Sequence, residues 1–436
     1  MKPLLFKISL TWSILIFIIF YSCSSGPIID YPELYREQVL DWENRLRENP
    51  DDFEALRNLG MYYSQIKEHN IAKDYIDRAL AIKPADPAVM LYKGVNLEHF
   101  GKPNEALEYY KRYVDVPESS PYREVIEGRF LWIKRQKDYA DVKLMIQQED
   151  EISAAEISPN TMAVFPLIYQ GINPDYVPLS RGFSEMVSID LAKIPRLTIL
   201  ERIRIQAVLD ELKFAQSDFV DQSTAPRSGR ILRAGTIVSG DYDVTDQGNF
   251  KINLGSWDTQ STERKSWVNK SGKLDDFFVL QKEVVFAFLE MNGIDLTIQE
   301  KESIATIPTQ NLESFLAYSK GLLLEDAGKF NEASLEYQRA AQLDPRFQIA
   351  GDKLKSSQII SKIGGSTDEI ITVLRAEDPV LKNEQINIIE NRVQSTSSNI
   401  TSSFTQGIDS RSPAEESNVT IITTPLPPPP PPPVGP

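Results

Sequence analysis

Few side chains in this 436-residue chain could make or break bonds. The sequence contains two histidines, His69 and His99, and one cysteine, Cys23. A histidine-based catalytic triad in the second half of the chain is excluded, because no histidine follows position 99. The two histidines lie 30 residues apart at different positions of a helical region, so we predict no shared metal site there. Cys23 follows an N-terminal apolar run, which argues against a cysteine nucleophile or a zinc site.

Paired carboxylates and glycine-lysine segments are the remaining chemical candidates. Asp275 and Asp276 could in principle perform general acid–base catalysis, but in a chain with 62 acidic and 47 basic residues such pairs are expected on solvated faces. Residues 94–102 and 321–329 resemble a phosphate loop, yet each has six residues between its glycines rather than four, and neither has Ser or Thr after the lysine. We therefore predict no catalytic residue, no cofactor site and no metal site, and a protein that is not an enzyme.

The charge of the chain limits its partners. The formal net charge is −15 and no long basic run occurs, so binding to nucleic acid through phosphates is not expected. An acidic protein also gains little from anionic lipid headgroups. Attachment to a membrane must therefore come from a separate anchor.

Residues 1–22 predict a secretory signal. Lys2 and Lys7 precede an apolar run at 8–20, which is shorter than the roughly 20 residues needed to span a bilayer. Cys23 follows directly, and the segment resembles a bacterial lipoprotein signal, in which this cysteine is lipidated. The resemblance implies a lipid anchor, and Ser24 next to Cys23 fits sorting of such lipoproteins to the outer membrane, facing the periplasm, with 23–31 as a linker.

One alternative for the N-terminus stays open. Phe20, Tyr21 and Ser22 are bulkier than the residues that usually precede a lipidated cysteine. The alternative is a plain secretory signal followed by a chance cysteine.

A 34-residue period organises residues 32–154. Small and large residues recur at this step in three series: Gly60, Gly94 and Gly128; Ala72, Ala106 and Ala140; Trp42, Ile76, Tyr110 and Leu144. This is the tetratricopeptide pattern of two antiparallel helices per unit, with a small residue where they cross. We predict three whole units at 53–154 after a half unit at 32–49. A further unit and a capping helix are predicted at 310–362, where the same pattern places Gly321, Ala333, Tyr337, Ala340 and Pro345.

The concave face of such an array is the predicted binding site. The first helix of each unit projects six side chains inward: Arg57, Ser64, Glu98, His99, Arg129 and Trp132. Two arginines and a tryptophan are residue types that anchor peptides, so we predict a protein or peptide partner in this groove. In the alternative, the groove is filled by the preceding or following helix of the chain itself.

Residues 160–300 have a different pattern. The runs "TMAVFPLIY", "LTILE" and "AGTIVSGDYDV" predict strands separated by helices, and two alternating runs that follow predict antiparallel strands. Parallel strands joined by crossovers and then a meander indicate a layered α/β unit. Pro195 should end the first helix. Glu201 and Arg202 then lie between a strand and the next helix, either as an ion-paired joint or as a contact to a neighbouring subunit.

The same stretch resembles the CsgG family. The similarity rests on "MAVFPLIYQG", the strand that ends in Glu201-Arg202, the "SDFVD" turn and "AGTIVSGDY". The family comprises envelope lipoproteins related to the curli-secretion channel, with a core similar to the N-terminal domain of TolB. The resemblance implies an α+β multidomain protein with a tetratricopeptide solenoid, a CsgG/TolB-N-like α/β sandwich domain at 160–300 and homo-oligomerisation through that domain.

The C-terminal segment, 363–436, is predicted to be largely disordered. It is rich in Ser and Thr and ends in seven consecutive prolines, a composition that buries little apolar surface. The prolines should form a polyproline II rod, either as a spacer or as a ligand for an aromatic groove.

Together these features predict a lipid-anchored envelope scaffold or adaptor that mediates protein–protein interactions in the assembly or secretion of envelope components. The alternative is an oligomeric outer-membrane secretion channel subunit of the curli transport type. A pore-forming member needs two additional hairpins of membrane-spanning strands, each about 9–11 residues long. Residues 234–272 offer about three strands, and charged residues such as Lys251 and Asp258 interrupt them, which favours the scaffold.

Overall fold

A computed structural model describes residues 35–153, 156–212 and 224–377, all within one compact unit of the chain. The predicted signal, Cys23, the "SDFVD" turn and the polyproline run lie outside the described residues. Over the described ranges, no helix combines the length and the apolar character needed to cross a bilayer.

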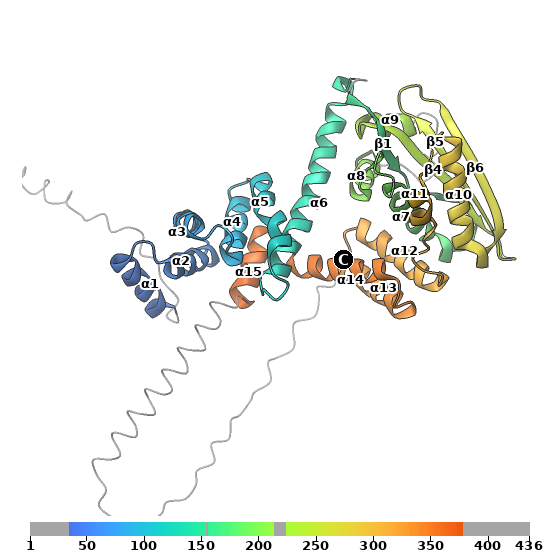
Figure 1. Ribbon diagram of the computed structural model, residues 1–436. Coiled ribbons are helices and arrows are strands. Elements are labelled where there is room, and N and C mark those ends of the chain that lie inside the picture. The colour runs from blue at the N-terminus through green and yellow to red at the C-terminus, as the bar shows by residue number, and fades with distance from the viewer. Residues whose placement is uncertain (1–34, 154–155, 213–223, 378–436) are drawn as a thin grey trace, which may run out of the picture. The chain divides into compact units, whose positions relative to one another are not determined.

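The N-terminal part is built of antiparallel helices (Figure 1). Their bounds are α1 Arg36–Glu48, α2 Phe53–Gln65, α3 His69–Ile82, α4 Pro87–His99, α5 Pro103–Tyr110 and α6 Arg123–Gln147, with short 3₁₀ turns η1 Lys111–Asp115 and η2 Glu149–Glu151. Asp52 and Asp86 are the N-cap residues of α2 and α4, and each carboxylate accepts a backbone N–H of the first turn. The capped helices α2 and α4 pair with α3 and α5, as the predicted repeat requires.

The periodic glycines lie where the helices of a unit cross. A Cβ atom on Gly60 would come within 2.6 Å of Ile76 Cγ1, and one on Gly94 would collide with the ring of Tyr110. Ala72 is fully buried in the same interface. The small and large residues of the period are therefore complementary in shape.

The predicted third unit is wrong in its second half. α6 is one continuous helix of 25 residues, because no proline, and no glycine after Gly128, interrupts it. Leu144, which matches the period, is 55% exposed. A Cβ atom on Gly128 would instead come within 2.7 Å of Ile359. The helix that packs on α6 at this crossing is thus α14, Gln348–Ile363, from the other end of the described chain.

The middle of the chain forms a six-stranded mixed sheet. Its strands are β1 Ser158–Val164, β2 Ile168–Tyr169, β3 Thr198–Ile199, β4 Ala234–Val244, β5 Asn249–Asp258 and β6 Arg264–Lys273. The order is β3-β1-β4-β5-β6, with β2 beside β4. β1 runs parallel to β3 and β4, and β4, β5 and β6 are antiparallel, as the sequence predicts.

Helices cover both faces of the sheet. They are η4 Pro174–Tyr176, α7 Leu179–Ala192, α8 Arg202–Leu212, α9 Thr224–Ile231, η6 Leu274–Asp276, α10 Phe277–Met291 and α11 Ile298–Ala305. Met162 and Val164 of β1 pack with α7 and α10. Ala163 and Phe165 point to the opposite face and pack with α8, α9 and the C-terminal half of α6. The sheet is therefore the middle layer of three.

The C-terminal repeat shares the core of the sheet domain. It comprises α12 Leu312–Asp326 and α13 Phe330–Leu343, followed by α14. Gly182 of α7 lies so close to Ser319 of α12 that a Cβ atom would overlap its hydroxyl. Phe315 and Tyr318 of α12 belong to the same apolar cluster as Phe277 of α10. The second repeat region is thus fastened to the sheet by apolar packing.

The predicted loss of order from residue 363 onward is wrong for its first part. Thr367–Glu377 form α15, and Ile370, Ile371 and Leu374 are 1%, 1% and 4% exposed. These three side chains fall on one face of the helix, and burial against other helices gives the segment its order. The rest of the predicted tail lies outside the described residues.

Candidate functional site

Two of the predicted groove residues, Glu98 and Arg129, form an ion pair. The Arg129 guanidinium donates to the Glu98 carboxylate, with Nε 3.1 Å from Oε1. The side chains are 0% and 5% exposed respectively. Tyr110 Oη donates to the same carboxylate over 2.7 Å. A single carboxylate therefore accepts from two helices, α5 and α6.

Arg129 also fixes the turn between α14 and α15. Its Nη1 donates to the carbonyls of Ile363 and Gly365, at 3.1 and 3.0 Å. Burial alone would lower the pKa of Arg129, but the charge of Glu98 outweighs it and raises that pKa. The guanidinium thus stays charged while it holds a backbone turn.

Trp132 lies at the same turn. A Cβ atom on Gly364 would come within 2.9 Å of the Trp132 ring. The ring also meets Phe330 of α13 edge to face, with centroids 6.3 Å apart. Trp132 is therefore covered by the C-terminal helices.

His99 stacks on His69, with ring centroids 3.6 Å apart. His69 Nδ1 is 2.9 Å from Asn96 Oδ1. Burial lowers the pKa of His69, which favours the neutral ring. In the described part of the chain, no group of three or more His, Cys, Asp or Glu side chains is placed to hold a metal ion.

The other two predicted residues bond within α2. Ser64 is fully buried and its Oγ donates to the Gly60 carbonyl over 2.9 Å. Arg57 is half-buried, and its Nε donates to Asn58 Oδ1 over 3.1 Å. The structure therefore joins Glu98 and Arg129, places Trp132 and His99 near the C-terminal helices, and leaves Arg57 and Ser64 outside this cluster.

The surface formed by α2, α4 and the start of α6, here called the repeat groove, is covered by α15. α15 packs against α2 and α4. Gln65 Nε2 lies 3.4 Å from the Leu374 carbonyl, and the Gln65 carbonyl accepts from Arg375. Lys67 pairs with Asp368 at 2.8 Å. The sequence leaves open whether the groove is free for a partner or filled by a neighbouring helix of the same chain. In the structure a following helix, α15, fills it.

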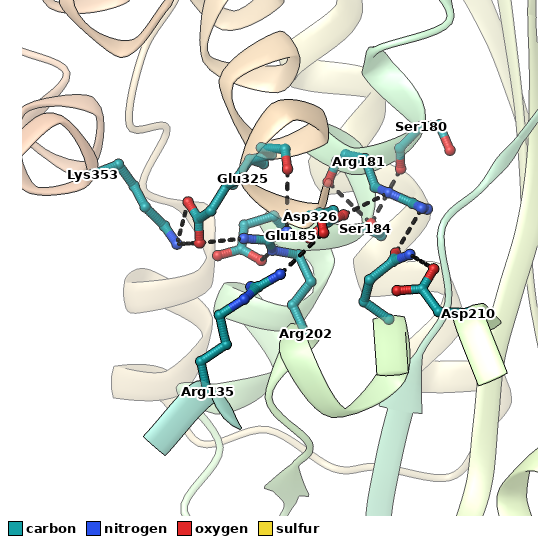
Figure 2. Close-up of polar contacts among 12 residues, drawn as sticks. Arg135, Ser180, Arg181, Ser184, Glu185, Arg202, Asp210, Glu325, Asp326 and Lys353 are labelled. Atoms are coloured by element: carbon teal, nitrogen blue, oxygen red, sulfur yellow. Dashed lines mark hydrogen bonds and ion pairs between the residues drawn. The ribbon is translucent and has the colours of Figure 1, made fainter. Parts of the chain in front are cut away.

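A second charged cluster lies where the sheet domain meets the C-terminal repeat (Figure 2). Arg202 follows β3 at the start of α8, and its Nη2 donates to Glu325 Oε1 over 2.7 Å. The same guanidinium pairs with Asp326, the last residue of α12, and lies 3.4 Å from Glu185 of α7. The predicted Glu201-Arg202 joint is thus ion-paired, but its partners come from other helices of the chain. Glu201 itself pairs with Lys134 of α6.

Glu325 is the acceptor at the centre of this junction. Lys353 Nζ of α14 lies 3.1 Å from it, and Tyr337 Oη donates over 2.6 Å. Burial would raise the pKa of Glu325, but Lys353 and Arg202 lower it to about 2. Burial would also lower the pKa of Arg202, and the nearby carboxylates, Glu325 foremost, raise it instead. Both groups are therefore charged at neutral pH.

Asp326 gathers further arginines. Arg181 Nε of α7 is 2.8 Å from Asp326 Oδ2, with 11% and 4% of the two side chains exposed. Arg135 Nη2 of α6 donates to the Asp326 carbonyl over 3.0 Å. Burial and the charge of Arg202 lower the pKa of Arg181 to about 10, so it too stays protonated at neutral pH.

A cavity of about 400 Å³ adjoins the junction. Its charged lining residues include Lys134, Lys353, Glu185 and Glu201, and the ion pairs above compensate them. Such a balanced lining offers no excess of either sign to an anion or a cation. The arrangement suits a fixed joint between α6, α7, α8, α12 and α14.

Sequence reasoning missed this junction. The repeat pattern does relate Glu325 to Glu98, because each lies four residues after the periodic glycine of its unit. The approach of Arg202, more than 100 residues earlier in the chain, has no local signal. It depends on the way α7 packs on α12.

Comparison with known proteins supports the repeat. Residues 53–86 match the family model described as a tetratricopeptide repeat, and no curated protein matches the chain. Among solved structures, the C-terminal domain of LpoB from Salmonella enterica is 12% identical, covers 31% of this chain and 94% of that chain, and has a TM-score of 0.22.

The chain therefore contains a tetratricopeptide repeat, a kind of unit that generally binds protein partners. The matched residues are α2 and α3 with their flanking turns. The resemblance of residues 160–300 to the CsgG family stays a prediction.

Proposed function

We propose that this protein is a lipid-anchored scaffold or adaptor of the cell envelope, of the CsgG-like class. Its repeat groove recruits a protein partner, and the protein acts in the assembly or secretion of envelope components without catalysing a reaction. The proposal joins the repeat, the predicted lipidation at Cys23 and the resemblance of the sheet domain.

The observation that carries the proposal is the helix in the repeat groove. α15 buries Ile370, Ile371 and Leu374 against α2 and α4. A surface that accepts an amphipathic helix of its own chain has the shape and the apolar character to accept such a helix from a partner. Protein recruitment is thus the activity that this geometry supports best.

The junction supports a scaffold role. Arg202 is held by Glu325 and Asp326 of the C-terminal repeat, and apolar packing surrounds the same contact. Breaking a buried pair of this kind is costly because it leaves a charge without its partner. The repeats and the sheet domain would then act as a unit, as a scaffold requires.

Anchoring can be tested by metabolic labelling with a palmitate analogue, using the wild-type chain and Cys23→Ser. We expect lipid on the wild-type protein, which should sediment with membranes, and neither property for the variant. An unlabelled wild-type chain in the soluble fraction would contradict the anchor.

Recruitment can be tested by photocrosslinking in intact cells. A photoreactive amino acid replaces Arg57, on α2, or Lys355, an exposed control position on α14. We expect a discrete protein adduct from the first position and none from the second. Equal patterns at the two positions, or no adduct at either, would refute partner binding by the repeats.

A further inference from the structure

The end of the described chain has the features of a docked ligand. α15 has apolar residues at Ile370, Ile371 and Leu374, all buried, while Thr372 on the opposite face is exposed. Its first turn is acidic and its last turn carries Arg375. A single face of the helix thus makes the contact with the repeats.

The groove contacts the backbone of this helix as well as its side chains. Gln65, 2% exposed, donates to the Leu374 carbonyl and accepts from Arg375 through its own carbonyl. The Gln65 side-chain Nε2 also donates to Tyr92 Oη of α4 over 2.7 Å, which fixes its position. Contacts to a terminal carbonyl can be made with any helix that ends at this point, so they do not depend on the exact sequence of α15.

A short turn connects α15 to α14. Residues 364–366 read Gly-Gly-Ser, and Gly365 has a φ of +118°, a conformation that other residues rarely adopt. A linker this short gives α15 an effective concentration of the order of millimolar at the groove. Arg129 adds two hydrogen bonds to the turn.

We propose that the repeat groove binds a short amphipathic helix of a partner protein, with apolar residues at positions i, i+1 and i+4 and a basic residue at i+5, and that α15 is the built-in competitor for this site. The inference rests on the proposed function and specifies both the partner and its regulation. α15 itself displays the pattern, as Ile370, Ile371, Leu374 and Arg375.

Competition by a tethered helix sets a threshold for binding. A partner helix with the same affinity as α15 enters the groove only when its concentration exceeds the effective concentration of α15. Once displaced, α15 loses the packing that stabilises it, because isolated helices shorter than about 12 residues are marginal in water. Only partners with a well-matched helix therefore reach the groove.

The test uses a fluorescent peptide of residues 366–377 and the full chain in detergent. Peptide affinity is measured by polarisation for the wild type, for Ile371→Asp/Leu374→Asp, and for Thr372→Asp as the matched control on the exposed face of α15. We expect at least about tenfold tighter binding to the double variant than to the wild type, because its groove is vacated. Thr372→Asp should behave as the wild type.

Hydrogen exchange of the same proteins provides the second readout. The amides of α15 should be protected in the wild type and in Thr372→Asp and exchange at least about tenfold faster in the double variant, while α2 and α4 remain protected, which shows that the variant is folded. Equal peptide affinity for all three proteins, or no binding to the double variant, would overturn the proposal. So would a wild-type dimer that the double variant abolishes, because the occupant would then be a second copy of α15.

The outcomes separate this inference from the proposed function. Crosslinking at Arg57 in the opened double variant is compared with the wild type. Peptide binding without any partner adduct would contradict the proposed function but would still support competition by α15. Equal adduct yields from the wild type and the double variant would contradict competition by α15 but would still support partner recruitment.

Discussion

Glu98 of α4 and Glu325 of α12 are the same element of two repeats, used in two different ways. Each lies four residues after the glycine at its helix crossing, and each accepts a hydrogen bond from a tyrosine 12 residues later, Tyr110 or Tyr337. The repeat therefore builds a buried carboxylate that already has one donor. A cation must complete it, because an unpaired buried charge is costly.

The cations differ in origin and in consequence. Glu98 takes Arg129 from α6, two helices later in the array, and Arg129 then holds the turn before α15. Glu325 takes Lys353 from α14, two helices later, and also Arg202 from the sheet domain. The same carboxylate of the repeat thus serves in one case to hold the turn before α15 and in the other to join the C-terminal repeat to the sheet domain.

Replacing Arg202 should have the largest effect. Arg202→Met leaves Glu325, Asp326 and Glu185 without their shared cation, so we expect a loss of about 3–5 kcal/mol in the free energy of unfolding. Urea denaturation followed by circular dichroism measures it. Arg346→Met, at a side chain that is 94% exposed, is the control and should change little. A loss below about 1 kcal/mol for Arg202→Met would show that the junction is not an essential joint.

Acid should weaken the same junction. The pKa of Glu325 is lowered from 4.5 to about 2, so the ionised carboxylate contributes stability above pH 4.5, and this contribution is lost as the pH falls towards 2. The stability difference between the wild type and Glu325→Gln should therefore shrink by roughly 3 kcal/mol over that window. Denaturation curves of both proteins at several pH values measure it, and a constant difference would contradict the assigned pKa.

Arg129→Met should cost less, about 2 kcal/mol. Glu98 loses its cation, but release of the turn at Gly365 would let water reach the carboxylate. The variant should expose the amides of α15 to hydrogen exchange, whereas Arg202→Met should leave them protected. Equal hydrogen-exchange rates for the α15 amides in Arg129→Met and Arg202→Met would contradict the view that only the Glu98–Arg129 pair holds α15.

The two tyrosines sharpen the comparison further. Tyr110→Phe and Tyr337→Phe each remove one hydrogen bond to a carboxylate, worth about 1.5 kcal/mol. We expect the smaller loss for Tyr337→Phe, because Glu325 keeps two cations and Glu98 keeps one. Thermal and urea denaturation of both variants test the order, and the reverse order would contradict the account.

The smallest effect is expected at Glu201. Its ion pair with Lys134 is on the surface, with 60% of the Glu201 side chain exposed, so Glu201→Gln should cost less than about 1 kcal/mol. The neighbouring residue in the sequence, Arg202, is thus predicted to matter several times more. Similar costs at the two positions would mean that burial does not separate them.

Residue spacing predicted the local elements well. Gly60, Gly94 and Gly321 lie at helix crossings because the large residue 16 positions later needs the space. The alternation at the end of β1, where Ala163 and the next residue but one, Phe165, face one way and Met162 the other, follows from the period of a strand. Such patterns act over short distances in the chain and can be read from it directly.

The same spacing failed where a distant segment supplied the packing. Leu144 continues the 34-residue period but is exposed, because α14 completes the crossing at Gly128. Polar composition predicted disorder from residue 363, yet Ile370, Ile371 and Leu374 order α15 against the repeats.

The sequence by itself determined the helical repeat, with glycines at its crossings, and the succession of parallel and then antiparallel strands in the sheet. Helix and strand periods, glycine crossings and turn residues are properties of neighbouring positions, and they leave little choice. Only the tertiary structure decided that Arg202 completes one carboxylate and that α15 fills the repeat groove. Both contacts join residues more than 100 positions apart, and their stability comes from burial that exists only after the chain has folded.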